Sequence, residues 1–131
     1  MKVLYVDDEP DLISVVTRAL RLDRDIEVRA VGRAVDGLEI LASGVWKPDV
    51  VLLDVMMPEM DGPTMLEHIA ALPGPRLRVI FFTAQARDCE ILQLAERGAI
   101  GILTKPFDPM TLAGDIRRLV QAAGAIESPE T

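Results

Sequence analysis

The sequence predicts an α/β protein built on one doubly wound parallel sheet. Five short apolar runs alternate strictly with five segments in which the apolar residues have helical spacing. The apolar runs cover residues 2–6, 26–31, 49–53, 77–82 and 99–103. Strict alternation of strands and helices favours parallel strands joined by right-handed crossovers, with helices on both faces of the sheet. We therefore expect a (βα)5 architecture.

Four of the five predicted strands are almost continuously apolar, as strands covered on both faces are. They read KVLYV at 2–6, DVVLL at 49–53, LRVIFF at 77–82 and AIGIL at 99–103. The remaining strand, IEVRAV at 26–31, places Glu27 and Arg29 between apolar residues. That alternation is typical of a strand with one wetter face, so we expect this strand at an edge of the sheet.

The segments between the strands place apolar residues three and four positions apart, as amphipathic helices do. The stripes are Ile13, Val16 and Leu20; Val35, Leu38 and Leu41; Met65 and Ile69; Ile91 and Ala95; and Leu112, Ile116, Leu119 and Val120. Pro10 and Pro109 stand where a first helical turn accepts proline, and Asp108 is a candidate cap. Gly44 and Gly98 stand where helices end, so both boundaries of several helices are marked.

Length and charge limit the function. The chain has 131 residues, the size of a single domain; we assign 1–124 to that domain and 125–131 to a polar tail or linker stub. With 21 acidic and 14 basic residues the net charge is −7, which disfavours direct binding to nucleic acid or to an anionic membrane. One cysteine, Cys89, cannot form an internal disulfide, and no apolar stretch reaches the length of about 20 residues that a membrane span needs. We expect a cytoplasmic protein.

Reactive side chains follow four of the five predicted strands. They are Asp7, Asp8 and Glu9 after the first strand, Asp54 after the third, Thr83 after the fourth and Lys105 after the fifth. Ligands of such sheets bind at the carboxyl ends of the strands, where the strand order reverses. If strands one, three, four and five are neighbours, carboxylates, a hydroxyl and an ammonium group converge on one edge.

Crowded carboxylates need a compensating charge. Asp7, Asp8 and Asp54 would repel one another when ionised, so a proton or a cation must bind among them. Mg²⁺ suits the site because it prefers oxygen ligands and is commonly held by one or two carboxylates together with phosphate oxygens. Lys105 is redundant beside a metal unless an anion also binds, and a transferred phosphoryl group would be such an anion. An aspartate carboxylate can act as the nucleophile for that transfer.

Four motifs carry a family resemblance. YVDDEP at 5–10, LLDVMMPEMDG at 52–62, FFTA at 81–84 and LTKPF at 103–107 resemble, in order and spacing, the receiver domain of bacterial two-component response regulators. The resemblance runs from about Lys2 to Gly124. It implies a flavodoxin-like doubly wound sheet with strand order 2-1-3-4-5, and a signalling switch, not an enzyme.

The resemblance also implies roles for single residues. Asp54 would accept a phosphoryl group from a histidine kinase or a histidine phosphotransfer protein. Lys105 would pair with one phosphate oxygen, and Thr83 would bond another. In the family the corresponding Lys-Pro peptide bond is cis, which implies a cis bond between Lys105 and Pro106. Together these roles describe a phosphoacceptor site.

A Mg²⁺ cofactor follows from the same resemblance. Asp8 would bind the metal directly, and Asp7 would help, directly or through water. Asp54 and the main-chain carbonyl of Met56 would complete the protein's share of the metal shell. The implied metal residues therefore come from the first and third predicted strands.

Alternative functions require other residues at the same positions or a different context for the chain. A haloacid dehalogenase-like phosphohydrolase needs a second aspartate two positions after its nucleophile, where this chain has Met56. A flavodoxin-like flavin carrier needs a phosphate-binding loop of Ser, Thr and Gly after the first strand, where this chain has Asp7 and Asp8. A receiver-like adaptor that is never phosphorylated, and the receiver portion of a longer regulator or hybrid kinase, stay open.

The output of the switch is the least constrained part of the interpretation. We expect the surface of the fourth helix, fifth strand and fifth helix to bind an unknown downstream protein. Many receivers carry Tyr or Phe three residues before the lysine, where this chain has Ile102, so we expect the response in residues 83–88. Met56 and Gln85 border the path of hydrolytic water in the family, and the apolar Met56 favours slow or intermediate dephosphorylation.

Other residue types favour ordinary structural roles. His68 lies on the predicted third helix, away from the strand ends, and is expected at the surface. Tyr5 and Trp46 are interpreted as packing residues. Cys89 has no histidine near it in the sequence and is not expected to be a nucleophile.

Overall fold

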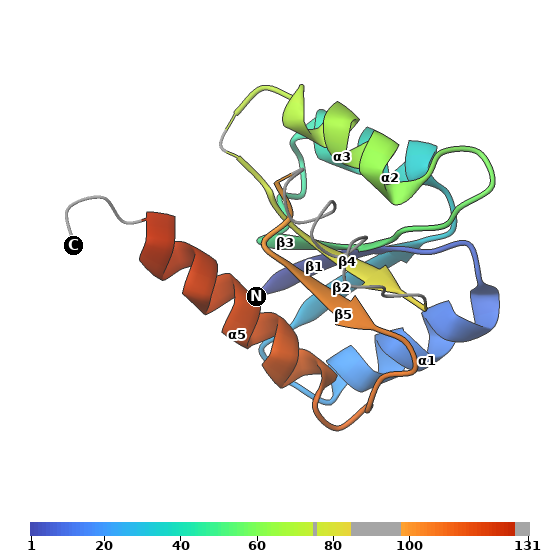
Figure 1. The fold of residues 1–131 in the computed structure, drawn as a ribbon, viewed down its shortest axis with the longest axis vertical. Coiled ribbons are helices and arrows are strands. Elements are labelled where there is room, and N and C mark those ends of the chain that lie inside the picture. The colour runs from blue at the N-terminus through green and yellow to red at the C-terminus, as the bar shows by residue number, and fades with distance from the viewer. Residues whose placement is uncertain (75, 85–97, 128–131) are drawn as a thin grey trace.

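The computed structural model describes residues 1–74, 76–84 and 98–127. Its strands form one parallel sheet in the order β2-β1-β3-β4-β5, as Figure 1 shows. The strands are β1 (Lys2–Val6), β2 (Glu27–Val31), β3 (Val50–Asp54), β4 (Arg78–Thr83) and β5 (Gly101–Thr104). The predicted doubly wound fold and its strand order are confirmed.

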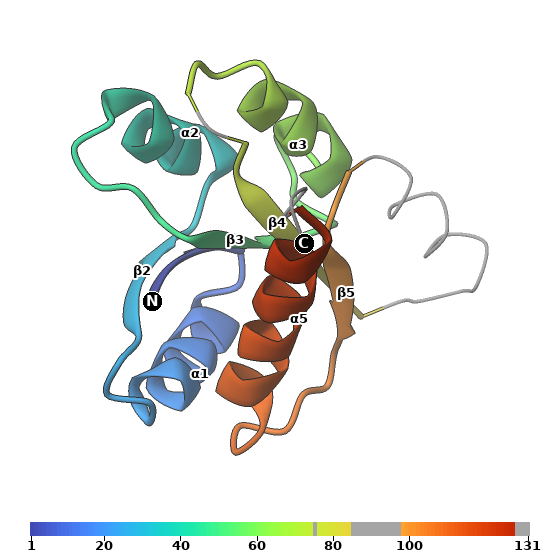
Figure 2. The same cartoon turned by 90° about the vertical axis from the view of Figure 1, so that its left-hand side faces the viewer.

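Helices cover both faces of the sheet. They are α1 (Pro10–Arg21), α2 (Ala34–Ser43), α3 (Gly62–Ala70) and α5 (Leu112–Glu127). Figure 2 shows α1 and α5 on one face and α2 and α3 on the other. The expected fourth helix, with Ile91 and Ala95, lies outside the described residues. None of the described helices is long and apolar enough to cross a membrane.

Local signals explain several helix boundaries. Pro10 is the first residue of α1, as predicted. The N–H groups of a first helical turn have no partner within the helix, so the N–H that proline lacks is not needed there. Gly44 ends α2 with a φ of 69°, a left-handed conformation that costs glycine little. The carboxylate of Asp61 accepts a hydrogen bond of 2.8 Å from the amide of Thr64 and so caps α3.

The start of α5 differs from the prediction. Pro109 was expected in the first helical turn, but it lies in a separate turn, and the helix begins at Leu112. The side chain of Asp108 accepts a hydrogen bond of 2.9 Å from the amide of Met110, within that turn. Aspartate followed by proline is also a strong turn signal, and here the turn is what forms.

The alternation of side chains along the strands divides the interior into two cores. Val3 and Tyr5 of β1 face the core that contains residues of α1 and α5. Leu4 and Val6 face the core that contains residues of α2 and α3. The central strands β1, β3 and β4 are therefore buried on both faces.

The two edge strands are less buried than the central ones. β2 is the expected edge strand. β5 forms the other edge, and three of its four residues are half-buried. Its apolar run predicted a strand covered on both faces, so β5 is less buried than predicted. An edge strand has a neighbour on one side only, which the apolar run does not reveal.

The same alternation orients the polar residues at the carboxyl ends of the strands. Asp7 continues the face of Tyr5, and Asp54 continues the face of Leu52, so both carboxylates lie on the side of α1 and α5. The strand order reverses between β1 and β3, because the chain goes from β1 to one side and from β3 to the other. Asp7 and Asp54 flank that reversal point, where ligands of doubly wound sheets bind.

Candidate functional site

Three aspartates converge at the carboxyl edge of the sheet. Asp7, Asp8 and Asp54 each place a carboxylate oxygen within 4.8 Å of the other two. Asp7 is completely buried and Asp54 is 4% exposed, whereas Asp8 is more open to solvent. The carboxylates that were predicted to meet at this edge of the sheet do lie together.

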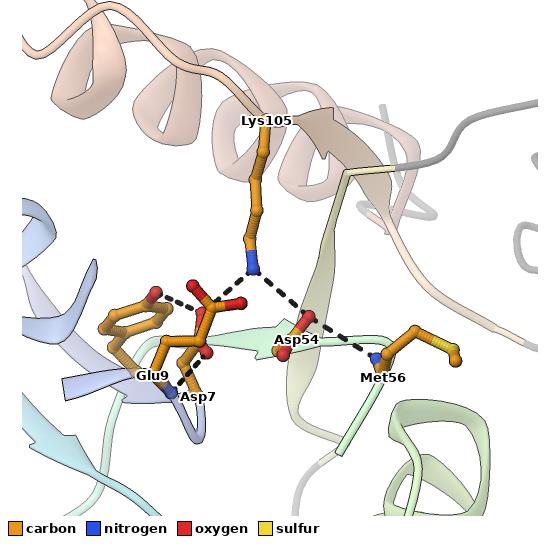
Figure 3. Close-up of polar contacts among 6 residues, drawn as sticks. Asp7, Glu9, Asp54, Met56 and Lys105 are labelled. Atoms are coloured by element: carbon orange, nitrogen blue, oxygen red, sulfur yellow. Dashed lines mark hydrogen bonds and ion pairs between the residues drawn. The ribbon is translucent and has the colours of Figure 1, made fainter. Parts of the chain in front are cut away.

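Lys105 brings a positive charge into this cluster from the end of β5. Its Nζ lies 3.1 Å from Oδ2 of Asp7 and 3.3 Å from Oδ1 of Asp54. Figure 3 shows Lys105 reaching toward both carboxylates. Its main-chain N–H donates a hydrogen bond of 2.8 Å to the carbonyl of Thr83, which continues the pairing of β4 with β5. The peptide bond between Lys105 and Pro106 is cis, as the family resemblance implied.

Asp7 is held by three hydrogen-bond donors. Its Oδ1 accepts from the main-chain N–H of Glu9 at 3.0 Å. Its Oδ2 accepts from the hydroxyl of Tyr5 at 2.5 Å as well as from Lys105. Tyr5 was interpreted as a packing residue, so its contact with the site was missed. The signal was the spacing of two residues on a strand, which puts Tyr5 and Asp7 on one face.

The environment of Asp54 opposes ionisation in the absence of a metal. Burial, and next the charge of Asp7, raise the pKa of Asp54 from 3.8 to about 6. Lys105 and the main-chain N–H of Met56, which lies 3.4 Å from Oδ1, act in the opposite direction. Burial lowers the pKa of Lys105, but the hydrogen bond to Asp7 and the two carboxylate charges outweigh it, so that pKa is raised. The lysine thus stays charged beside the carboxylates.

Two further predicted residues border the cluster. Thr83 is the last residue of β4, the strand beside β3, and is 4% exposed. Met56 follows β3 by two residues, and its side chain is turned to solvent, so that the residue is 76% exposed. The structure therefore places a buried threonine and an exposed methionine next to the strand ends that carry the cluster.

The donor atoms of this cluster suit a hard divalent cation. The three nearby side chains offer only carboxylate oxygens, the ligand type that Mg²⁺ prefers. The ammonium group of Lys105 lies within 3.3 Å of two of these carboxylates, which shows that the cluster accommodates a cation. Asp7, Asp8 and Asp54 are thus able to hold Mg²⁺.

Comparison with known families decides which class of protein carries this site. Residues 3–117 match the family of response regulator receiver domains. The chain belongs to this family. Among the relatives of this receiver domain is the sensor kinase CckA of Brucella abortus, 34% identical over 91% of this chain and 12% of that protein. The transcriptional regulatory protein CseB of Streptomyces avermitilis is 34% identical over 98% of this chain and 53% of that protein. This receiver domain thus spans about half or less of the length of these relatives.

Solved structures resemble this receiver domain along almost its whole length. The BeF3-activated DrrB receiver domain is 28% identical and superimposes with a TM-score of 0.77, covering 92% of this chain and 97% of that one. A response regulator receiver domain protein from Clostridium thermocellum is 26% identical with a TM-score of 0.81, covering 95% and 98%. The fold of this receiver domain is therefore shared by receivers of different proteins.

The remaining predicted residues have the expected surroundings where the structure describes them. His68 is exposed on α3, as predicted. Trp46 is buried, as predicted, and its Nε1 donates a hydrogen bond of 2.5 Å to Glu27. Gln85 and Cys89 lie outside the described residues.

Proposed function

We propose that this receiver domain is the phosphoacceptor switch of a two-component phosphorelay, with Asp54 as the phosphorylated residue. The observation that carries the proposal is the contact of Lys105 with both Asp54 and Asp7 at a buried strand end. A buried carboxylate nucleophile with a cation beside it is what phosphoryl transfer requires, because that reaction depends on positioning and charge neutralisation. The phosphoryl donor is a histidine kinase or a histidine phosphotransfer protein.

The transfer is a displacement at phosphorus. A carboxylate oxygen of Asp54 attacks the phosphorus atom of the donor's phosphohistidine. The bond from phosphorus to the imidazole nitrogen breaks, its electron pair stays with the nitrogen, and the imidazole takes up a proton. Lys105 moves to pair with a phosphoryl oxygen, and the hydroxyl of Thr83 donates a hydrogen bond to another.

The acidic cluster would serve as the metal site of this reaction. Asp8 would ligate Mg²⁺ directly, Asp7 would assist, directly or through water, and Asp54 and the carbonyl of Met56 would complete the protein ligands. When bound, the metal would neutralise the charge shared by Asp54 and the phosphoryl oxygens. Before the transfer, Asp7 is fully buried and accepts hydrogen bonds from three donors, which orient its carboxylate.

Phosphorylation then changes which partner the domain binds. The surface that includes β5 and α5, together with the expected fourth helix, presents the change to a downstream protein. Lys105 leads directly into this surface, because it follows β5 in the chain. The switch is the same if the chain acts alone or as the receiver portion of a longer regulator or hybrid kinase.

Labelling with a small acyl phosphate tests the proposal without knowledge of the kinase. With Mg²⁺ present, the wild-type chain should gain the mass of one phosphoryl group at Asp54, and Asp54→Asn should gain none. Asp49→Asn is the matched control, because Asp49 is an exposed carboxylate at the opposite end of β3. Undiminished labelling of Asp54→Asn, mapped to another residue, would contradict the assignment.

A further inference from the structure

We propose that Tyr5 is a positioning residue of the phosphoacceptor site: its hydroxyl keeps Asp7 hydrogen-bonded when Lys105 leaves Asp7 for the phosphoryl group. This inference rests on the proposed function and adds to it a residue that none of the four family motifs marks as functional. The observation behind it is that Tyr5 and Lys105 share one acceptor atom, Oδ2 of Asp7.

The two hydrogen bonds to that atom differ in length, and the two donor side chains differ in conformational freedom. The hydroxyl of Tyr5 lies 2.5 Å from Oδ2 of Asp7, whereas Nζ of Lys105 lies 3.1 Å from it. Tyr5 is completely buried within the first strand, while Lys105 is a flexible side chain that follows the last strand. Tyr5 is therefore the fixed donor and Lys105 the exchangeable one.

The need for a fixed donor follows from the burial of Asp7. No part of Asp7 is exposed to solvent, so bulk water does not replace a lost hydrogen bond at Oδ2. Leaving a buried charged acceptor without its donor is costly. When Lys105 moves to the phosphoryl oxygen, Tyr5 keeps Oδ2 bonded, and the amide of Glu9 keeps Oδ1 bonded. The movement of Lys105 is thus less costly because Tyr5 is present.

Aromatic packing holds the hydroxyl of Tyr5 in place. Its ring meets the ring of Phe82 edge to face, with centroids 6.2 Å apart and an interplanar angle of 62°. Phe82 in turn packs against Phe107 at 5.5 Å. Phe82 immediately precedes Thr83, so this ring packing connects Tyr5 to the strand that carries the site threonine. Because Phe82 already restricts the ring of Tyr5, this side chain loses little conformational entropy when its hydroxyl donates a hydrogen bond to Asp7.

The Tyr5→Phe variant isolates the hydroxyl, because it keeps the ring and its contact with Phe82. We expect the variant to bind beryllofluoride, a phosphoryl analogue, about tenfold more weakly than the wild type in the presence of Mg²⁺. Isothermal titration measures this affinity. Trp46→Phe is the control: it removes another buried aromatic donor with a 2.5 Å bond to a carboxylate, at Glu27, outside the site. Its affinity for beryllofluoride should equal that of the wild type.

A second measurement uses the wild-type chain and does not depend on the folding of a variant. Tyr5 is the only tyrosine, so its hydroxyl proton gives a single assignable NMR signal. We expect this proton to stay protected from exchange with water after beryllofluoride binds. Rapid exchange in the bound state would show that the bond to Asp7 is broken when Lys105 moves, and would overturn the role of Tyr5.

The outcomes separate this inference from the proposed function. Equal beryllofluoride affinity of wild type and Tyr5→Phe, with normal acyl phosphate labelling at Asp54, overturns the role of Tyr5 alone. Absence of both beryllofluoride binding and labelling in the wild type overturns both proposals. An equal loss of affinity in Tyr5→Phe and Trp46→Phe assigns the effect to general stability and also overturns the positioning role.

Discussion

Lys105 and Asp7 form an ion pair of 3.1 Å although they lie 98 positions apart in the chain. The side chain of Lys105 is 12% exposed and that of Asp7 is not exposed at all. Burying two charges costs about as much free energy as their attraction returns, so the pair itself adds little net stability. Removing one partner lowers the stability of the fold, because the other charge is then left buried without compensation.

Substitution of Lys105 by methionine should therefore destabilise the metal-free protein. We expect Lys105→Met to lower the free energy of unfolding by about 3 kcal/mol, because Asp7 and Asp54 lose their shared cation. Saturating Mg²⁺ should recover much of the loss, because the metal neutralises the same carboxylates. Urea unfolding with and without Mg²⁺ measures both values. Arg33→Met, which breaks the exposed pair with Glu59, should lower the free energy of unfolding much less, because solvent screens that pair. A loss in Lys105→Met that Mg²⁺ leaves unchanged would show that the metal binds elsewhere.

Magnesium itself should stabilise the native state. Asp7, Asp8 and Asp54 repel one another without a metal, and an ion that binds only the folded chain shifts the unfolding equilibrium. The melting temperature should rise with millimolar Mg²⁺, and the rise should vanish in Asp8→Ala. Glu39→Ala removes an exposed carboxylate from α2 and should retain the full rise. If Asp8→Ala also retained it, Asp8 would not be a ligand.

The raised pKa of Asp54 predicts a pH dependence of stability in metal-free solution. Its pKa is about 6 in the folded chain and 3.8 as the ordinary value, so the native state binds the proton more tightly. The stability that this group contributes is therefore complete below about pH 4 and is lost as the pH rises through about 6. The free energy of unfolding of the wild type, minus that of Asp54→Asn, should fall over this range in urea titrations. A difference that increases with pH would contradict the raised pKa.

The lifetime of the phosphorylated state should depend on Met56. Its side chain is exposed beside Asp54 and has no hydrogen-bonding group able to orient water. We expect Met56→Asn to dephosphorylate faster than the wild type, as measured by loss of label after the donor is removed. Met110→Asn, at a residue 80% exposed on the turn before α5, is the control and should decay at the wild-type rate. An unchanged rate in Met56→Asn would show that this position does not control water access.

Ile102 should move little on phosphorylation. It lies opposite Phe81 in the pairing of β4 with β5 and packs against the core on the side of α2 and α3. A β-branched side chain has few rotamers, so we expect the response in residues 83–88 instead, most of which lie outside the described residues. Methyl and backbone NMR shifts with and without beryllofluoride compare the two positions. A rotamer change at Ile102 with silent 83–88 amides would contradict this expectation.

Sequence patterns predicted the sheet and the convergence at its edge, because both depend on periodicity. Apolar runs revealed the strands, and the carboxyl ends of parallel strands necessarily share an edge, which brought Asp7, Asp54 and Lys105 together. The bond between Tyr5 and Asp7 escaped this reasoning. Periodicity indicated which face Tyr5 occupies, but the partner of its hydroxyl depends on the side-chain conformations of both residues.

Two other differences from the prediction concern Pro109 and β5, and their causes are different. Pro109 is compatible with both a first helical turn and a separate turn, and the hydrogen bond from Met110 to Asp108 decides for the turn. The run at 99–103 is as apolar as a central strand, but the position of β5 at an edge follows from the order of the whole sheet. The composition of residues 99–103 alone does not reveal the order of the strands.

The long chain separation between Asp7 and Lys105 has a consequence for synthesis. A chain emerging from the ribosome presents Asp7 and Asp54 well before Lys105, which follows them by 98 and 51 positions. An incomplete chain would hold the carboxylates without the lysine that keeps them together. A kinase would then find a competent acceptor only after β5 and Lys105 have joined the sheet, so acceptance of phosphate would require that this last strand is in place.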